Sequence, residues 1–369
     1  MCSFLLWPKK VAQAGLLGLT FLISIAALAQ DASQTTQDTV QDQPPLDVKL
    51  KAIPILSGSG AYFTKVTAGQ FQNAPTISPI LLVPIGDKLL LEGKGSFAET
   101  YSKAPDDDYF ENKASYGFSY AQVDYITRYM TFTAGRFITP FNIYAERFAP
   151  NWIKALQVSP LTSPITSGSA LGGMLRGGFP ATDKINLNYA FYFSANNTHH
   201  LLATDRSTGG RVGFFVPGPR LELGFSYQQV LQADRSHSAG GYFVWQPNRV
   251  PLSLRSEFVR SSGTKGKAYW IESAYRLSQI SALRRLELAA RGEQFFTADH
   301  LSAATLKKLG AFGKQTKEGD FGLNYYFRSD VRASAGYGRQ FIQGANANLW
   351  TIGMTYRFVM PLGPSGNRL

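Results

Sequence analysis

Apolar and polar residues alternate along most of this chain, in segments of about ten residues that end at turns. In one segment Phe321, Leu323 and Tyr325 alternate with Asp320 and Asn324, and residues 348–358 repeat the pattern. Successive side chains of a strand point to opposite faces, so each segment has one apolar and one polar face. Two-sheet sandwiches alternate as well, but here the second face carries Arg, Glu and Asn beside Gly. Strands that are apolar outside and polar inside are typical of an all-β fold, the closed antiparallel transmembrane β-barrel.

The first 29 residues have the features of a secretory signal peptide. A basic pair and an apolar run precede a small-x-small cleavage pattern at 27–29, so we expect the mature chain to start at Gln30. A transmembrane anchor is the alternative, because the apolar run approaches the length that spans a bilayer. The single cysteine, Cys2, lies in this segment, which excludes disulfides and cysteine-based metal sites from the mature protein.

Sixteen segments are predicted to be strands, and a barrel of fourteen stays possible because the first two alternate least clearly. The predicted strands are 50–64, 76–83, 88–101, 113–126, 130–138, 171–179, 184–194, 211–216, 220–231, 239–245, 251–260, 267–277, 285–296, 320–327, 331–341 and 348–358. Sixteen to eighteen strands leave an aqueous channel, whereas eight would be filled by side chains. We therefore expect four parts: a signal peptide (1–29), a flexible periplasmic segment (30–48), the barrel (49–358) and a tail (359–369).

The connections between these strands form two alternating classes. The short ones, rich in Pro, Gly, Asn and Asp, are 84–87, 127–129, 180–183, 217–219, 246–250, 278–284 and 328–330. The other class is 65–75, 102–112, 139–170, 195–210, 232–238, 261–266, 297–319 and 342–347. Bacterial barrels alternate short periplasmic turns with longer external loops. The alternation therefore predicts that both ends of the barrel segment lie on the periplasmic side.

The longest external connection follows the fifth predicted strand. The sequence GRFITPFN, at 135–142, spans the end of that strand and the start of the connection. This segment resembles the G-[RQ]-F-x-x-P-F-G motif of bacterial porins in the phosphate-selective porin superfamily, with Asn142 where Gly is usual. The resemblance implies a sixteen-stranded, often trimeric barrel whose third external loop folds into the lumen. Phosphate selectivity is not carried over, because the arginine ladder of that family has no residue-by-residue match here.

The residues of this third external connection also indicate a place inside the barrel. A loop of about thirty residues in a compact fold calls for a use. Phe148, Trp152, Ile153 and Leu156 make the segment 141–164 too apolar to stand in water. Packed against the inner wall, the loop would narrow the pore; an external cap or a trimer contact is the alternative.

Charge, together with the alternation of side chains between the two faces of each strand, suggests which residues meet a solute. The 37 Lys and Arg residues exceed the 25 Asp and Glu residues, which favours a weak preference for anions. Acids and bases lie two residues apart on the polar face, as Arg291 and Glu293 do, so they could instead merely pair and stiffen the wall. The predicted pore-lining or constriction residues are Lys94, Arg147, Arg176, Arg211, Arg255, Arg276, Arg285 and Arg291.

An outer-membrane enzyme is the first alternative. The four histidines, at 199, 200, 237 and 300, all lie in predicted external loops. The sequence contains neither a Gly-x-Ser-x-Gly elbow nor a His-Glu-x-x-His motif. The acidic run 106–108 lacks the ligand spacing of a calcium loop. We predict no enzymatic activity, no cofactor and no metal site.

The sequence thus predicts an outer-membrane porin for small hydrophilic solutes. Two other barrels stay open: one with a blocked lumen and a structural or adhesive role, and a channel specific for oligosaccharides. The second would need an aromatic slide, for which the inward candidates are Tyr192, Phe215, Tyr242, Trp270 and Tyr326. Expected partners are outer-membrane lipid and lipopolysaccharide, small anionic or polar solutes and two further copies in a homotrimer. Nucleic acid is excluded by export.

Overall fold

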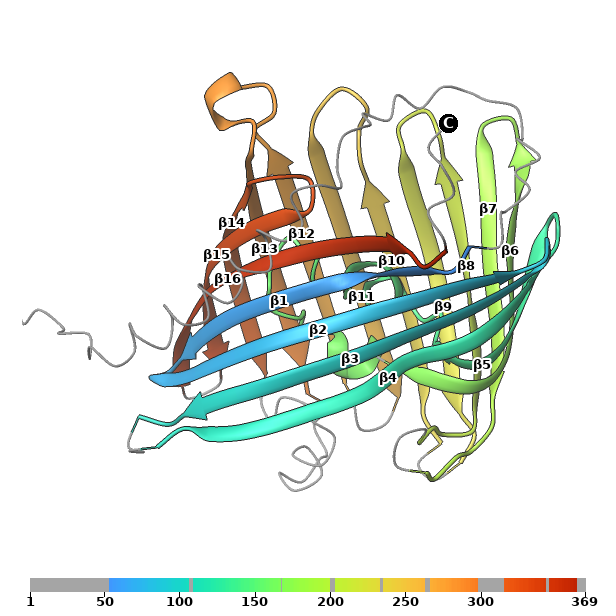
Figure 1. The fold of residues 1–369 in the computed structure, drawn as a ribbon, viewed down its shortest axis with the longest axis horizontal. Helices are drawn as coiled ribbons and strands as arrows, with labels where there is room; N and C mark the ends of the chain where they lie inside the picture. Colours follow the sequence, from blue (N-terminus) through green and yellow to red (C-terminus); the bar gives the residue numbers. More distant parts are fainter. Residues whose placement is uncertain are drawn as a thin grey trace, which may run out of the picture. The chain divides into compact units, whose positions relative to one another are not determined.

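A computed structural model describes residues 53–105, 109–166, 168–199, 203–232, 235–262, 266–297, 315–342 and 345–363. These residues form a closed barrel of sixteen antiparallel strands, in which each strand pairs with its neighbours in sequence and β1 pairs with β16 (Figure 1). The predicted all-β barrel and its strand number are confirmed. The predicted signal peptide and the segment 30–48 lie outside the described residues.

The strands are β1 Ile55–Thr67, β2 Gln70–Ile85, β3 Leu89–Lys103, β4 Glu111–Ile126, β5 Met130–Ile138, β6 Ser169–Thr182, β7 Ile185–Ser194, β8 Ser207–Val216, β9 Leu221–Val230, β10 His237–Trp245, β11 Leu252–Ser262, β12 Lys267–Arg276, β13 Leu286–Phe296, β14 Thr316–Tyr326, β15 Val331–Ile342 and β16 Ala345–Pro361. Among the described connections there are three short helical turns: η1 Tyr144–Phe148, α2 Ser163–Thr166 and η2 Ser281–Leu283. In the described part of the chain, no helix has the length and hydropathy needed to cross a membrane.

The outer face of the barrel is an apolar belt. Phe225, Phe321 and Ile352 are more than three-fifths exposed, and many other large apolar side chains share their orientation. Water would make such a surface costly, whereas hydrocarbon covers it. The closed ring also pairs the backbone groups of every strand within the protein, as the bilayer interior requires. These two properties place the chain in the bacterial outer membrane.

The first hairpin corrects the sequence-based boundaries. Residues 65–75 were expected to form a long external connection, but β1 and β2 continue through this segment to a two-residue turn. Ala68 and Gly69 form that turn with positive φ angles of 48° and 81°. The prediction of a loop was wrong because polar residues such as Gln70 and Gln72 suggested one. A strand that extends beyond the bilayer can carry polar side chains and still keep its backbone hydrogen bonds to the neighbouring strand.

The last hairpin also differs from the expected boundaries. β15 ends at Ile342 and β16 starts at Ala345, so the expected connection 342–347 is mostly strand. β16 also extends beyond the expected end at 358, because Val359 and Pro361 pair with Ser57 and Ile55 of β1.

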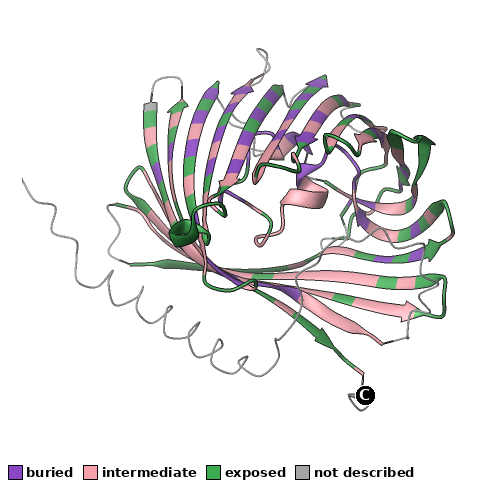
Figure 2. Ribbon diagram, turned by 90° about the horizontal axis from the view of Figure 1, so that it is seen from above, coloured by how far each residue is buried: buried purple, intermediate pink, exposed green. Residues whose placement is uncertain are grey.

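The inner faces of the two halves of the barrel differ in exposure. From β8 to β15 inward residues are mostly buried, as the regular alternation in β11 and β12 shows. In β2 and β3 nearly all residues are partly exposed. Figure 2 shows the same contrast, with a segment of chain inside the ring, beside the strands that carry buried residues. The inside of the barrel is therefore covered on one side only.

Candidate functional site

The third long connection lies inside the barrel. It runs from residue 139 to residue 168, and we call its described part, 139–166 and 168, the lumen loop. Its atoms contact inward side chains of eight consecutive strands, from Arg211 of β8 to Arg332 of β15. The expected position of this loop in the lumen is therefore seen directly in its contacts.

The start of the lumen loop is held by a buried carboxylate. Oε1 of Glu257, on β11, accepts hydrogen bonds from the backbone N–H groups of Ile143 and Tyr144, at 2.7 and 2.6 Å. Its other oxygen accepts from the indole Nε1 of Trp270 at 3.1 Å. Glu257 is fully buried. From β8, Arg211 donates to the carbonyl oxygen of Asn142 at 2.7 Å. Strand side chains thus satisfy loop backbone groups that would otherwise lack partners.

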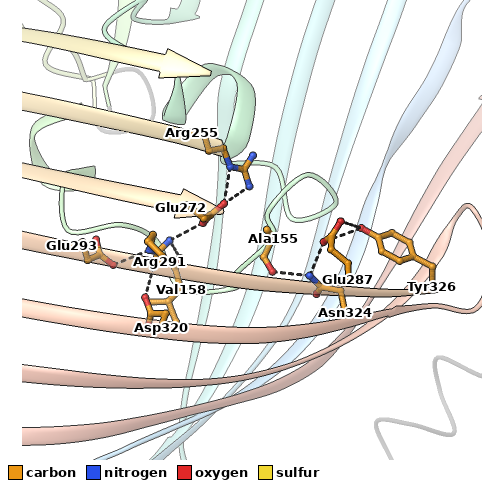
Figure 3. Close-up of polar contacts among 10 residues, drawn as sticks. All are labelled: Ala155, Val158, Arg255, Glu272, Glu287, Arg291, Glu293, Asp320, Asn324 and Tyr326. Atoms are coloured by element: carbon orange, nitrogen blue, oxygen red, sulfur yellow. Dashed lines mark hydrogen bonds and ion pairs between the residues drawn. The ribbon is translucent and has the colours of Figure 1, made fainter. Parts of the chain in front are cut away.

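The rest of the loop is held in the same way, and Figure 3 draws two of these contacts. Arg291 of β13 donates to the carbonyl oxygen of Val158 at 2.9 Å, and the amide of Asn324 donates to that of Ala155 at 2.9 Å. Arg332 of β15 likewise donates to the carbonyl oxygen of Asn151 at 2.8 Å. Because wall side chains bind both N–H and carbonyl groups of the loop, its path across the wall is specified at many points.

Apolar packing and small residues complete the fit. Phe141, Leu161 and Ile165 of the loop form a buried cluster with Val259 and Phe295 of the wall, among others. At Gly322 of β14, a Cβ atom would stand 2.5 Å from the end of the Leu156 side chain, so a larger residue there would require Leu156 to move.

The departure from the porin motif at Asn142 has a conformational explanation. Asn142 has a φ of 56°, in the left-handed region that favours glycine. Asn is one of the few other residues that adopts this conformation readily. The residue therefore preserves the turn that glycine would make, and its backbone N–H also receives a partner, the hydroxyl oxygen of Ser226, at 2.9 Å.

Beneath the loop, five charged side chains form one buried network (Figure 3). Arg291 bonds to Glu293 and to Asp320 at 2.9 Å each, and Glu272 lies 3.6 Å from Arg291 and also pairs with Arg255. Buried charges are stable only when paired and hydrogen-bonded. The carboxylates of Glu293, Asp320 and Glu318 could also approach one cation, since one oxygen from each lies within 4.8 Å of the others. Arg291 already supplies positive charge to two of them.

The uncovered side of the lumen carries a different set of charges. Lys94 has an inward position on β3, and Lys154 is a partly buried residue of the lumen loop. Burial lowers the pKa of Lys154 to about 8, and the positive charges of Arg291 and Lys94 act in the same direction. The two lysines are therefore close enough across the lumen to influence each other, one from the wall and one from the loop.

Two ion pairs in the lumen expose their cations. Arg147 of the loop lies 2.7 Å from Glu222, and the exposed fractions of the two side chains are 34% and 13%. Arg176 of β6 lies 2.8 Å from Asp124, with exposed fractions of 36% and 1%. In the pair of Arg211 with Glu146 the acid is the more exposed partner, since Arg211 is buried beneath the loop. In the first two pairs the acid lies behind the arginine, so water meets mainly positive charge.

The residues predicted from the sequence occupy three environments. Lys94 and Arg176 lie on the uncovered side of the lumen, whereas Arg147 belongs to the lumen loop and pairs with Glu222 of β9. Arg276 stacks on the ring of Tyr326. Arg211, Arg255 and Arg291 are buried and bind the loop or the network beneath it. Arg285 precedes β13 at the short-turn end and is exposed.

The predicted site residues did not include Lys154, Glu257 or Arg332. Glu257 and Arg332 occupy inward positions in the alternation of their strands, so the sequence indicated that both side chains point into the barrel. Lys154 lies in an irregular loop, where alternation gives no orientation.

Replacing Glu257 with Ala should release the start of the lumen loop. Two buried N–H groups would lose their acceptor, at about 1–3 kcal/mol each. Hydrogen exchange of a peptide covering 141–148 should then speed up by at least about tenfold, while the strand ladder keeps its protection. Glu257→Gln retains an acceptor oxygen and is the matched control. Equal protection in the two variants would show that this carboxylate does not hold the loop.

Comparison with known proteins finds similarity in structure only. No model of a protein family matches the sequence, and no curated protein matches it. Pseudomonas putida OprB matches with a TM-score of 0.56 over 83% of this chain and 92% of its own, at 8% identity. The outer membrane channel DcaP of Acinetobacter baumannii matches with a TM-score of 0.52, over 84% and 99%, at 11% identity. An anion-selective porin from Comamonas acidovorans matches with a TM-score of 0.50, over 83% and 98%, at 11% identity. At these identities the likeness establishes the barrel fold alone.

Proposed function

We propose that the protein is an outer-membrane porin, a water-filled channel for the passive diffusion of small hydrophilic solutes, with a weak preference for anions. The observation that carries this proposal is the one-sided cover of the lumen. The loop occupies the β8–β15 wall, and the inner face of β2 and β3 stays accessible. A solute would pass between the loop and the opposite wall. The names of two structural neighbours, a channel and an anion-selective porin, agree with this function.

The preference for anions follows from which charges face the passage. Lys94 and Lys154 flank it, and the arginines of two ion pairs are more exposed than their acids. Fixed charges along a pore raise the local concentration of ions of the opposite sign. Arg276 would add to this effect. Glu92 lies near the pair of Asp124 and Arg176, which keeps the expected preference weak.

The predicted site residues then divide into two roles. Lys94, Arg147, Arg176 and Arg276 would meet the solute. Arg211, Arg255 and Arg291 would position the loop, because their guanidinium groups bind loop carbonyls or buried acids. Arg285 would act only at the short-turn mouth.

Other barrel functions receive less support. An aromatic slide for oligosaccharides needs accessible rings, but Tyr192, Tyr242 and Trp270 are buried in packing. A homotrimer and a relationship to the phosphate-selective porin superfamily are further parts of the proposal, supported by the segment 135–142. We propose no enzymatic role and no cofactor.

Planar-bilayer recordings test this function. In a salt gradient at pH 7, purified protein should give open channels whose reversal potential indicates an anion preference. The preference should fall between pH 7 and pH 9. Lys154, with its pKa at about 8, is charged below this value and neutral above it, whereas an ordinary lysine would stay charged.

The variant Lys154→Arg is the control for the pH dependence. Arginine stays protonated, so its anion preference should remain constant over the same range. A preference for cations at pH 7 would refute the charge argument. A protein that inserts into the bilayer but passes no current would favour the barrel with a blocked lumen.

A further inference from the structure

The outer surface of the barrel carries a cluster of cations that the pore does not use. Arg260, Lys267, Lys317 and Arg339 occupy lipid-facing positions of β11, β12, β14 and β15, and all four are exposed. Each lies within the first or last few residues of its strand, at the end where the long connections are. We call these four residues the rim cluster.

The rim cluster has no compensating acid on its own surface. Among the described lipid-facing positions of β10 to β16, none is Asp or Glu. Within the same part of the chain, no ion pair that the structure describes includes a member of the cluster. The charge is therefore left for a ligand or for solvent.

Two of the cations lie directly opposite each other. Arg260 of β11 is the cross-strand partner of Lys267 of β12. Like charges at such positions, with Cβ atoms about 4.5–5.5 Å apart, destabilise a sheet. A bound anion between them would turn this repulsion into a pair of attractive contacts.

Aromatic rings lie beside the cations, and outward residues nearer the middle of the strands, such as Phe258 and Phe321, are exposed and apolar. Lys267 stands 4.8 Å from the centre of the Phe296 ring, and Arg339 stands 5.3 Å from that of Phe341. Phe341 is also the cross-strand partner of Lys317. A ligand for this surface needs anionic groups at the level of the cations and hydrocarbon below them.

We propose that the rim cluster binds the phosphate groups of lipopolysaccharide, the phosphorylated glycolipid of the outer leaflet, with its acyl chains against the aromatic belt. The position fits, because long connections mark the external side of a bacterial barrel. The charge fits as well, since arginine and lysine bind phosphate through charge-assisted hydrogen bonds. The site lies on the opposite side of the wall from the lumen, so it is independent of the proposed channel function.

The test is native mass spectrometry of the detergent-purified protein with bisphosphoryl lipid A. A variant with Arg260, Lys267, Lys317 and Arg339 all replaced by Gln should lose at least about tenfold in affinity, because each cation near an anionic lipid surface contributes measurably. The control replaces Lys88, Lys184, Arg249 and Arg284 by Gln. These residues are exposed at the short-turn end, and the same change in net charge there should alter the affinity less than about twofold.

Several outcomes would overturn the proposal. Equal losses in the two variants would indicate only the overall charge of the protein, and full binding by the rim variant would place the lipid elsewhere. Equal affinity of the wild type for dephosphorylated lipid A would show that acyl chains alone are recognised, and equal affinity for phosphatidylglycerol would show a general anionic-lipid surface. Heat-modifiable electrophoretic mobility equal to that of the wild type confirms that both variants fold. If the fourfold variant fails to fold, Arg260→Gln with Lys267→Gln tests the directly opposed pair.

Discussion

Replacing Lys94 and Lys154 together with Glu is expected to convert the channel from anion preference to cation preference. The two lysines face the same passage from the wall and from the loop, and each replacement changes the local charge by two units. Two charges about 4 Å apart interact by about 1 kcal/mol even in water, and more in a partly desolvated pore. The anion-to-cation permeability ratio should therefore change by an order of magnitude or more. The reversal potential in a salt gradient measures this change and should reverse its sign.

Matched variants separate a local effect from that of net charge. Lys94→Gln with Lys154→Gln should give an intermediate selectivity, since it removes the charges without reversing them. Lys88→Glu with Lys184→Glu makes the same change of four charge units at the short-turn end, where both residues are exposed. Because salt screens these exposed charges from the passage, the selectivity of this control variant should stay nearly unchanged. The charge argument fails if the lumen variant and this control behave alike.

Deleting residues 150–164 is expected to raise the single-channel conductance by on the order of twofold, because a wider aqueous cross-section carries more ions. The deletion removes the loop backbone that Arg332, Asn324 and Arg291 now bind, and so exposes the β13–β15 wall to water. Lys154 leaves with the segment, so anion preference should fall at the same time. Single-channel recordings measure both quantities in one experiment.

The folding of the deletion variant needs a separate measurement. The strand ladder does not include the deleted residues, so heat-induced loss of the compact electrophoretic form should occur at nearly the same temperature as in the wild type. Shortening the connection between β7 and β8 gives a control that removes loop residues outside the lumen loop. Unchanged conductance in the 150–164 deletion, with an intact barrel, would mean that this segment does not limit the passage.

The sequence predicted the barrel well because the alternation of apolar and polar residues is a local property. This alternation alone gave the inward orientation of Arg255, Arg291 and Glu257. It failed at the first hairpin, where polar residues belong to strands that extend past the bilayer. There, Ala68 and Gly69 alone form the turn.

The alternation of residues along the strands could not show which inward side chains are exposed to water. Arg255 and Arg176 have the same orientation in the sequence pattern, yet the lumen loop buries the first and leaves the second partly exposed. This difference depends on contacts between residues more than a hundred positions apart, such as Ile143 with Glu257. Lys154 was missed for a related reason, since its direction depends on where the loop packs.

The attachment of the lumen loop to eight consecutive strands also has a mechanical consequence. An arc of the ring that is cross-linked from within resists bending, whereas the unbraced arc around β1–β4 has only its ladder to keep its curvature. Lateral pressure from the bilayer should therefore flatten that arc first. The barrel would respond to stress as a stiff half-shell closed by a compliant one.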